Sequence, residues 1–448
     1  MDLSKQIEHF VSALNYDDLP EKVRETAILC VYNYIGCAYG GNQENVSCVT
    51  RSIIPEFFSE GKCHVFGTTL MTDPVTAAMV NGTTASSISF DDIFKAGTFH
   101  PGISAITAAL TVADLVKPTG KQLIAAIVAA YEVANRISLC CGKAHYKYWH
   151  TAATVGSFCA AVAAAKLLKL EGEAFISALG TAGTQTAGLQ ECAGNMAQRL
   201  HLGLACRNGV LAALLAKQGF YGPQHILDGD KGFLAAMTDC SADTENIFGD
   251  LGSRYTILDT TFKLYPCCGF INACVDAAIQ VSRRNNLSWK NIEKVRVGTY
   301  QIAIDHSGNP NPQNCEEAKF SIAYCVSTGF IRDGLALSDF QEWPPHEDIL
   351  DLMKKVEVYK DDICESNYPL GKRGSVISVT MDDGATYDLA CYDRKGDPEY
   401  PPTMEELETK FTNLVGMVLS EEDTKHLADL IKQLPELEDA SLLNDAHK

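Results

Sequence analysis

The sequence predicts a mainly α-helical protein, built from a large all-helical domain and a smaller α+β domain. Alanine-rich apolar segments recur with helical spacing up to about residue 265, whereas alternating apolar strands and a hairpin turn occur only after Pro266. A chain of 448 residues is long enough for two or three domains. We therefore expect a helical domain over 1–265, an α+β domain over 266–402, and C-terminal helices over 403–448 that complete the first domain.

The first domain takes its helices from five segments in which apolar residues recur with a helical period. These segments are 21–39, 104–116, 121–139, 151–168 and 204–218. Alanine is the best helix former, and its small side chain lets helices approach closely. Residues 151–165 carry no charge but are too short to span a bilayer, which takes about 20 residues. We expect them to form a buried helix.

The second domain is predicted from strands that alternate in polarity. Strands are expected at 295–304, 356–359, 376–381 and 385–392, with helices at 273–281 and 321–330 between them. Asp382-Asp383-Gly384 separates the last two strands and is typical of a hairpin turn. Thr403 then precedes two amphipathic helices, at 404–415 and 420–433.

Charge and cysteine usage limit the partners and the compartment. Lys plus Arg number 37 and Asp plus Glu number 56, a net charge of −19, which argues against a sequence-independent nucleic-acid binder. Any anionic substrate therefore needs a local basic pocket. The seventeen cysteines include no C-x-x-C pair, which favours reduced thiols in the core of a cytoplasmic protein. The N-terminus has no apolar signal core, and we expect no contact with a membrane.

Three polar segments between helices are candidates for chemistry. A loop at 89–102 holds Asp91, Asp92 and His100, although the two aspartates would also serve simply as helix caps. His150 directly precedes a helix, whose dipole lowers the pKa of an imidazole and favours a bound anion; an aromatic surface loop or subunit contact is the alternative. Arg199 is a candidate carboxylate clamp or, alternatively, a solvated side chain.

These segments resemble the MmgE/PrpD family in order and spacing over nearly the whole chain. The matching runs are 80–82, 90–92, 100–102, 108–110, 156–168, 200–205, 226–233, 263–268, 319–324 and 395–398. The resemblance implies an MmgE/PrpD-like fold, an active site between the two domains and a homodimer. It also implies chemistry with no metal and no cofactor. Members of the family include dehydratases, decarboxylases and an epimerase.

The resemblance implies catalytic roles for His100, His150 and Tyr324, with Asp91 or Asp92 orienting a histidine. The chain departs from the family pattern at three positions that we assign to substrate binding. These are Gln198 in place of a lysine, Asn272 in place of a histidine and Ser89 in place of an aspartate. Arg199 and Lys263 are the cations that remain near the site in sequence.

The loss of a lysine and a histidine bears on the substrate. A tricarboxylate needs about one charge-assisted partner per carboxylate, each worth roughly 1.5–3 kcal/mol. The departures therefore argue against 2-methylcitrate or cis-aconitate and favour a smaller or less charged acid. We expect a lyase, either a dehydratase or a decarboxylase, that acts on a small hydroxy- or unsaturated carboxylic acid by histidine-mediated proton abstraction. An isomerase or epimerase with the same acid–base pair, and a non-catalytic homologue that binds a metabolite, are the alternatives.

Overall fold

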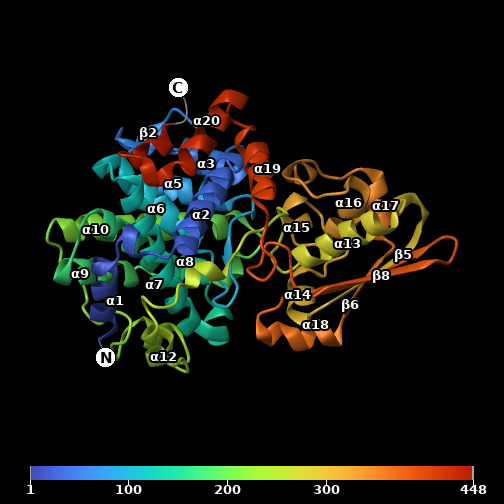
Figure 1. Cartoon of the computed structure of the whole chain (residues 1–448), viewed down its shortest axis with the longest axis horizontal. Coiled ribbons are helices and arrows are strands. Elements are labelled where there is room, and N and C mark those ends of the chain that lie inside the picture. Colours follow the sequence, from blue (N-terminus) through green and yellow to red (C-terminus); the bar gives the residue numbers. More distant parts are fainter. Residues whose placement is uncertain (1, 446–448) are drawn as a thin grey trace. The chain divides into compact units, whose positions relative to one another are not determined.

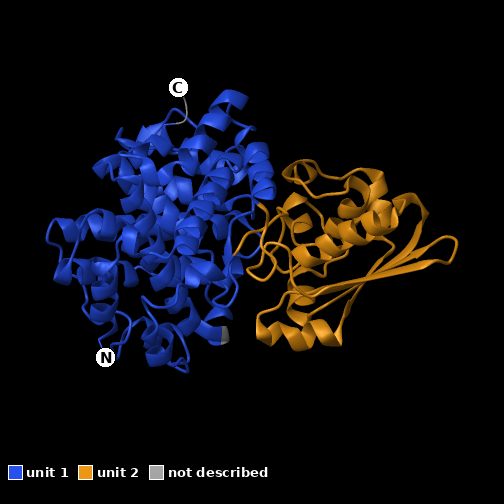
Figure 2. Ribbon diagram, viewed as in Figure 1, with its two compact units in different colours: residues 1–260, 404–448 blue, residues 261–403 orange. Residues whose placement is uncertain are grey.

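The computed structural model describes residues 2–445, except for the side chain of Lys143. The chain divides into two compact units, which Figure 2 colours separately. Unit 1 contains residues 1–260 and 404–448, and unit 2 contains residues 261–403. Helices dominate the described residues of unit 1. Among all the described residues, the one sheet of more than two strands belongs to unit 2. The predicted fold class, mainly α with a smaller α+β part, is confirmed.

Unit 1 is built from the following elements, labelled as in Figure 1. Its helices are α1 (Leu3–Ala13), α2 (Glu21–Gly40), α3 (Asn45–Ser52), α4 (Ile54–Phe57), α5 (Pro74–Ser86), α6 (Pro101–Val116), α7 (Gly120–Tyr146), α8 (Thr151–Leu167), α9 (Gly172–Gly183), α10 (Met196–Lys217), α11 (Phe233–Met237), α12 (Thr244–Gly249), α19 (Met404–Val415) and α20 (Glu421–Lys432). Its short strands are β1 (Cys63–His64), β2 (Met71–Thr72) and β3 (Ile93–Phe94), and β4 (Thr260–Thr261) lies where the chain leaves the unit.

Helix α8 is the centre of unit 1. Each of its residues except Lys166 is buried, as expected for this uncharged segment, and α6, α7, α9 and α10 pack around it. Small residues make this close packing achievable: a Cβ on Gly209 of α10 would lie 2.4 Å from the backbone nitrogen of Ala161 in α8. The segment Gly120–Gly142 is long and apolar enough to cross a bilayer, but 94% of its most apolar window is buried inside the protein, as in a core helix.

Two boundaries in unit 1 differ from the prediction. Helix α10 begins at Met196 and not at 204, because the Asn195 side chain accepts a hydrogen bond from the backbone N–H of Ala197 and so caps the polar first turns. Helix α7 continues past residue 139 but is interrupted at Gly142, whose φ of 61° is outside the helical region.

The C-terminal helices pack on α2. The ring of Phe411 in α19 stacks on the ring of Tyr32 in α2, with 4.3 Å between centroids. The buried Lys410 ammonium donates hydrogen bonds of 2.7 Å to Asn33 Oδ1 and to the Phe90 carbonyl oxygen. Helix α19 therefore holds the backbone directly before Asp91.

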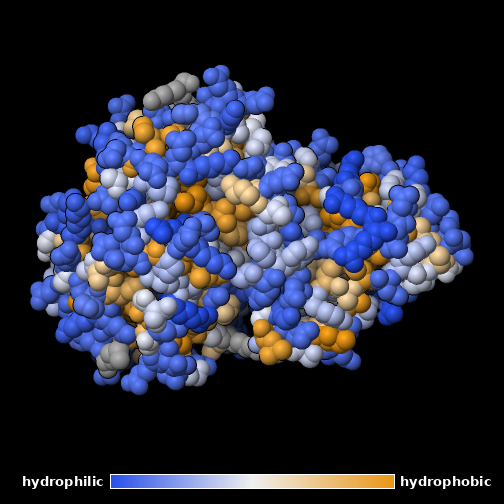
Figure 3. Space-filling view, viewed as in Figure 1, coloured by the Kyte–Doolittle hydropathy of each residue, from blue (hydrophilic) through white to orange (hydrophobic). Residues whose placement is uncertain are grey.

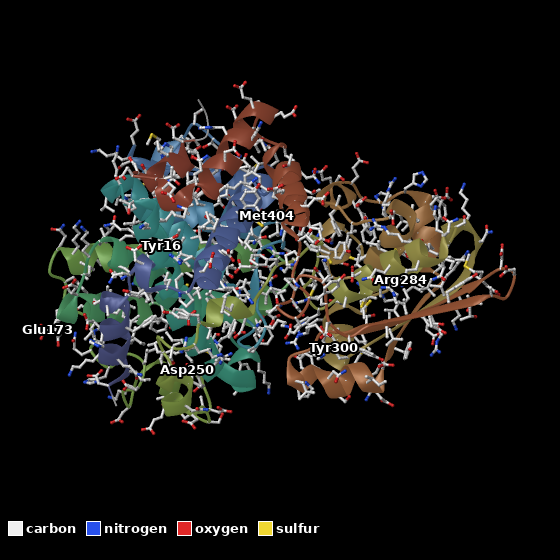
Figure 4. All side chains as sticks on the ribbon, in the orientation of Figure 1. Tyr16, Glu173, Asp250, Arg284, Tyr300 and Met404 are labelled. Carbon is white, nitrogen blue, oxygen red and sulfur yellow. The ribbon has the colours of Figure 1, made fainter. Side chains whose placement is uncertain are left out.

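Ion pairs and hydrogen bonds of Arg136 and Glu132 join α7 to the segment after α12. The Arg136 guanidinium lies 2.7 Å from Glu132 Oε2 and 2.6 Å from Asp250 Oδ1 (Asp250 is labelled in Figure 4). Glu132 also accepts hydrogen bonds from the backbone N–H groups of Thr256 and Ile257, and burial raises the pKa of its carboxyl. The pair thus ties residues 250–257 to the helical core.

Unit 2 contains six helices and four strands among its described residues. The helices are α13 (Asn272–Asn285), α14 (Gln301–Ser307), α15 (Cys315–Ala318), α16 (Ile322–Arg332), α17 (Glu347–Met353) and α18 (Asp362–Asn367), and the strands are β5 (Ile292–Thr299), β6 (Val356–Lys360), β7 (Ser375–Met381) and β8 (Thr386–Cys391).

The four strands of unit 2 form one sheet in the order β6-β5-β7-β8, in which β5 and β6 are parallel and the other pairs antiparallel. Alternate side chains of β7, such as Ile377 and Val379, are buried in a core shared with α13 and α16. The strand predicted at 295–304 ends at Thr299, so the prediction is wrong for 300–304. Tyr300 (labelled in Figure 4) is buried with its hydroxyl donating to the Phe270 carbonyl oxygen, and α14 follows it.

The face shown in Figure 3 consists mostly of hydrophilic residues, interrupted by small hydrophobic groups. Isolated apolar side chains of this kind are normal on a protein surface. The seventeen cysteines, all among the described residues, are free thiols, and most of them are buried.

Candidate functional site

The Asp91–His100 pair is the most clearly built chemical feature of unit 1. His100 is the N-cap residue of α6, and its Nδ1 lies 2.6 Å from Asp91 Oδ2 and 3.0 Å from the Asp92 carbonyl oxygen. Both neighbours are acceptors, so we assign the hydrogen to Nδ1, which leaves the lone pair of the neutral ring on Nε2. The side chain of Asp91 is 5% exposed and that of His100 is 27% exposed. A carboxylate thus orients an accessible imidazole, which is the arrangement of a general base and its positioning group.

Asp92 has a different environment from Asp91. Its Oδ2 accepts a hydrogen bond of 2.9 Å from the Tyr131 hydroxyl, and it touches His100 through its backbone carbonyl. Burial, followed by the neighbouring charge of Asp91, raises the pKa of Asp92 to about 6. A Cβ on Gly102 would lie 2.1 Å from Asp92 Oδ1, so glycine in the first turn of α6 makes room for this carboxyl. Of the two aspartates, Asp91 has the geometry to orient His100.

His150 is held in neutral form. It is the N-cap residue of α8, is 7% exposed, and its Nδ1 has no hydrogen-bond partner among the described residues. Burial lowers the pKa of its ring to about 3, and the nearby His100, His201 and Arg199 act in the same direction. At neutral pH the ring is therefore a hydrogen-bond donor or a ligand, and it does not hold an extra proton.

Arg199 and its neighbour Gln198 lie at the start of α10. Arg199 Nη2 donates a hydrogen bond of 2.5 Å to the Oγ of Ser89, a buried residue with a left-handed φ of 55°. Gln198 is turned back on its own chain, because its Oε1 accepts a hydrogen bond from the Gly194 N–H at 3.1 Å.

The other three predicted site residues belong to unit 2. Tyr324 in α16 is buried, its hydroxyl donates to the Asp339 carbonyl oxygen, and burial raises its pKa well above the ordinary value. Asn272 at the start of α13 uses its amide nitrogen within unit 2, with Nδ2 3.1 Å from Cys267 Sγ and 3.1 Å from the Cys268 carbonyl oxygen. Lys263 is buried in the same unit.

The sequence comparisons agree with the resemblance described above. Residues 5–244 match the MmgE/PrpD N-terminal domain, and residues 265–436 match the MmgE/PrpD C-terminal domain. The chain belongs to the MmgE/PrpD family. Related MmgE/PrpD proteins include a cis-aconitate decarboxylase of Aspergillus terreus. It is 28% identical over an alignment 470 positions long, which spans 98% of this chain and 95% of the relative. The human cis-aconitate decarboxylase is 27% identical over 463 residues, covering 99% of this chain and 94% of the relative.

A probable 2-methylcitrate dehydratase of Saccharomyces cerevisiae is 24% identical over 396 residues, or 81% of this chain and 76% of that protein. By name, these MmgE/PrpD relatives are decarboxylases and dehydratases, which are carbon–carbon and carbon–oxygen lyases. This MmgE/PrpD chain is accordingly an enzyme of the lyase type.

Three side chains near the predicted residues of this MmgE/PrpD member were not foreseen as site residues. Tyr131 binds Asp92, the His201 ring centroid lies 5.7 Å from that of His150, and Cys192 Sγ lies 3.4 Å from His201 Nδ1. His201 lies two residues after the candidate Arg199, but the sequence predicted no role for it. Cys192 stands in a polar turn with no motif around it, so the sequence carried no signal for it.

Proposed function

We propose that this MmgE/PrpD enzyme removes water or carbon dioxide from a small hydroxy- or unsaturated carboxylic acid with fewer carboxylates than cis-aconitate. The observation that carries the proposal is the Asp91–His100 pair, in which a buried carboxylate 2.6 Å from Nδ1 leaves Nε2 as a proton acceptor. The decarboxylase and dehydratase names of the relatives support the reaction class.

His100 shuttles one proton in either reaction. In a dehydration, Nε2 takes the proton from the carbon next to the carboxyl and returns it to the departing hydroxyl, so that water leaves and a double bond forms. In a decarboxylation, the protonated ring supplies the proton that replaces the departing carbon dioxide. Histidine is the side chain that most often serves as a general acid and base, so it suits both directions.

His150 and Arg199 complement this proton transfer. A neutral His150 ring stabilises charge by donating a hydrogen bond to the substrate oxygen on which charge develops, because its lowered pKa keeps it from acting as the base. Arg199 pairs with a substrate carboxylate. His100 is then the base of the histidine pair, and His150 is the electrostatic partner.

The two departures from the family pattern favour an acid of low charge. Gln198 and Asn272 stand where the family resemblance implies a lysine and a histidine, and both amides are engaged in hydrogen bonds within their own segments. Each missing charge-assisted contact is worth roughly 1.5–3 kcal/mol to a bound carboxylate. We therefore place mono- and dicarboxylic acids before tricarboxylic acids as substrates.

The test is a panel of mono-, di- and tricarboxylic hydroxy- and unsaturated acids, incubated with the protein in heavy water and followed by proton NMR. Loss of water or carbon dioxide from a mono- or dicarboxylic acid supports the proposal. Exchange of a carbon-bound proton for deuterium without such loss would replace the lyase with an isomerase. A preference for tricarboxylic acids would contradict the substrate argument.

The role of His100 is tested with a matched control. His100→Gln should lower kcat/KM by roughly 10²–10⁴-fold, the usual contribution of general acid–base catalysis. His225→Gln serves as the control, because the side chain of His225 is 63% exposed and lies outside the proposed site. Equal activities of the two variants would show that His100 is not the base.

A further inference from the structure

Two histidines and one cysteine converge in unit 1 beside the proposed acid–base pair. They are His150 before α8, Cys192 in the turn Gln190–Cys192 and His201 in α10, and one donor atom from each lies within 4.8 Å of the other two. We propose that these three residues bind one soft divalent metal ion of the zinc class, and that the bound ion inhibits the enzyme. The inhibition, but not the binding, rests on the proposed function.

The distances suit a tetrahedral ion. Zinc binds thiolate sulfur at about 2.3 Å and imidazole nitrogen at about 2.0–2.1 Å, which places sulfur and nitrogen about 3.6 Å apart around a tetrahedral centre. Cys192 Sγ and His201 Nδ1, 3.4 Å apart, already have this spacing. His150 completes the set from the opposite segment through a small movement of its ring.

The environment of the donors also points to a ligand. His150 and Cys192 are 7% and 8% exposed, and the His150 Nδ1 has no hydrogen-bond partner among the described residues. A buried polar atom in this state is unfavourable, and metal coordination would satisfy it. The cluster differs in this respect from His145, which is also buried but has both ring nitrogens hydrogen-bonded, to the Met237 carbonyl oxygen and to Thr154.

The backbone fixes the turn against the His150 segment. The His150 N–H donates to the Gly188 carbonyl oxygen at 2.9 Å, and the Gln190 N–H donates to the Tyr148 carbonyl oxygen at 3.0 Å. Gly188 has a φ of 130°, and a Cβ there would lie 3.1 Å from His201 Nδ1. Glycine therefore supplies the backbone conformation of this turn and keeps space beside the donor atom.

The ligand types select the metal. One thiolate and two imidazoles suit Zn²⁺ and its spectroscopic substitute Co²⁺, whereas Mg²⁺ and Ca²⁺ require oxygen ligands. The Cys192 thiol loses its proton to solvent as the sulfur–metal bond forms, so binding releases one proton for each ion bound. Three protein ligands leave a fourth position for water. This inference departs from the expectation of a metal-free site.

Inhibition follows from the position of His150. A ring coordinated to the ion is no longer free to turn toward the substrate, and the added positive charge acts on His100, which already interacts electrostatically with His150. Zinc-class ions would then act as reversible inhibitors, which a chelator removes.

The binding experiment titrates Co²⁺ alone into the metal-free full-length protein and records the ultraviolet thiolate-to-cobalt charge-transfer absorption. We expect one ion per chain with this absorption. Cys192→Ser should abolish this absorption. It should also weaken the binding of Zn²⁺ by roughly 100-fold or more, measured by competition with a chromophoric chelator. His201→Gln should weaken the binding of Zn²⁺ by a similar factor. This second variant keeps the test decisive if Cys192→Ser does not fold.

Matched controls come from exposed residues of unit 1. Cys240→Ser and His225→Gln remove an exposed thiol and an exposed imidazole, and both variants should retain the absorption and the affinity. No stoichiometric binding in the unmodified protein, or persistence of the absorption in Cys192→Ser, would overturn the metal site. Loss of the absorption in Cys240→Ser would overturn it as well.

Activity is measured separately, as the ratio of rates with and without Zn²⁺ for each variant. Zn²⁺ should inhibit the unmodified protein and Cys240→Ser but not Cys192→Ser at the same concentration. If the ion binds and the rate does not change, the inhibitory role is wrong. If no acid is turned over at all, the proposed function fails, while the cobalt spectrum still decides the metal site.

Discussion

Replacing Asp91 by asparagine tests the central contact of the proposed site. The substitution keeps the size of the side chain but removes the negative charge 2.6 Å from His100 Nδ1. The amide either accepts the Nδ1 hydrogen as a neutral group or turns its NH₂ toward Nδ1. In the second case the ring hydrogen moves to Nε2, and the lone pair needed for proton abstraction no longer faces the substrate.

The two cases bound the expected effect. A charge-assisted hydrogen bond is worth about 1.5–3 kcal/mol and a neutral one about 0.5–1.5 kcal/mol, so the lost charge alone corresponds to roughly tenfold in rate. The wrong tautomer of a catalytic histidine costs up to about 10⁴-fold. With Asp91 5% exposed and His100 27% exposed, solvent screens this contact only partly. We expect kcat/KM to fall by about 10- to 10⁴-fold.

The assay compares initial rates on the best acid from the panel, with a second histidine–aspartate pair of unit 1 as the control. His64 Nδ1 lies 3.0 Å from Asp114 Oδ1, and the two side chains are 24% and 4% exposed, similar to the first pair. Asp114→Asn should lower the raised pKa of His64 but leave kcat/KM within about threefold. The reasoning is refuted if Asp91→Asn also stays within that range, or if both variants lose activity equally.

Three further predictions concern stability. Burial raises the pKa of Asp92 from 3.8 to about 6, so its protonated form stabilises the fold by about 3 kcal/mol below pH 3.8, and this stabilisation is lost as the pH rises through about 6. Asp92→Asn should remove this loss when the free energy of unfolding is measured in denaturant at about pH 4 and pH 7. An identical pH dependence in both proteins would contradict the prediction. Arg136→Ala should lower the free energy of unfolding by about 3–5 kcal/mol, because it leaves the buried Glu132 without its cation. A loss below about 1 kcal/mol in urea unfolding would show that the ion pair is dispensable. Phe411→Ala should cost about 3–5 kcal/mol by removing the buried ring between α19 and α2, whereas the exposed Phe57→Ala should cost little when measured the same way.

The helical part of the fold was predictable wherever apolar residues form an uninterrupted pattern. The segments predicted at 21–39 and 151–168 agree with α2 and α8 to within one residue at each end. The prediction missed the first turns of α10, where polar side chains hide a helix that Asn195 caps. It also extended β5 beyond Thr299, because apolar alternation continues into α14 and periodicity alone does not show where the backbone turns.

The candidate site was predictable only in part, for a similar reason. Asp91 and His100 are near in sequence, so their pairing within one loop could be expected. His150, Cys192 and His201 come from three separate segments, and their approach depends on how α8 and α10 pack. The hydrogen bonds of Gln198 and Asn272 within their own segments likewise depend on rotamers that no spacing rule specifies.

The return of α19 to unit 1 has a consequence for biosynthesis. Lys410 holds the Phe90 carbonyl oxygen, and so the backbone that leads into Asp91, yet it is translated after all of unit 2. Domains generally fold in the order in which they leave the ribosome, so unit 2 can fold while unit 1 still lacks this contact. A nascent chain that has emerged only as far as residue 403 therefore holds Asp91 and His100 without the helix that supports their loop. The loop of the proposed acid–base pair therefore gains its supporting helix only after unit 2 has been translated.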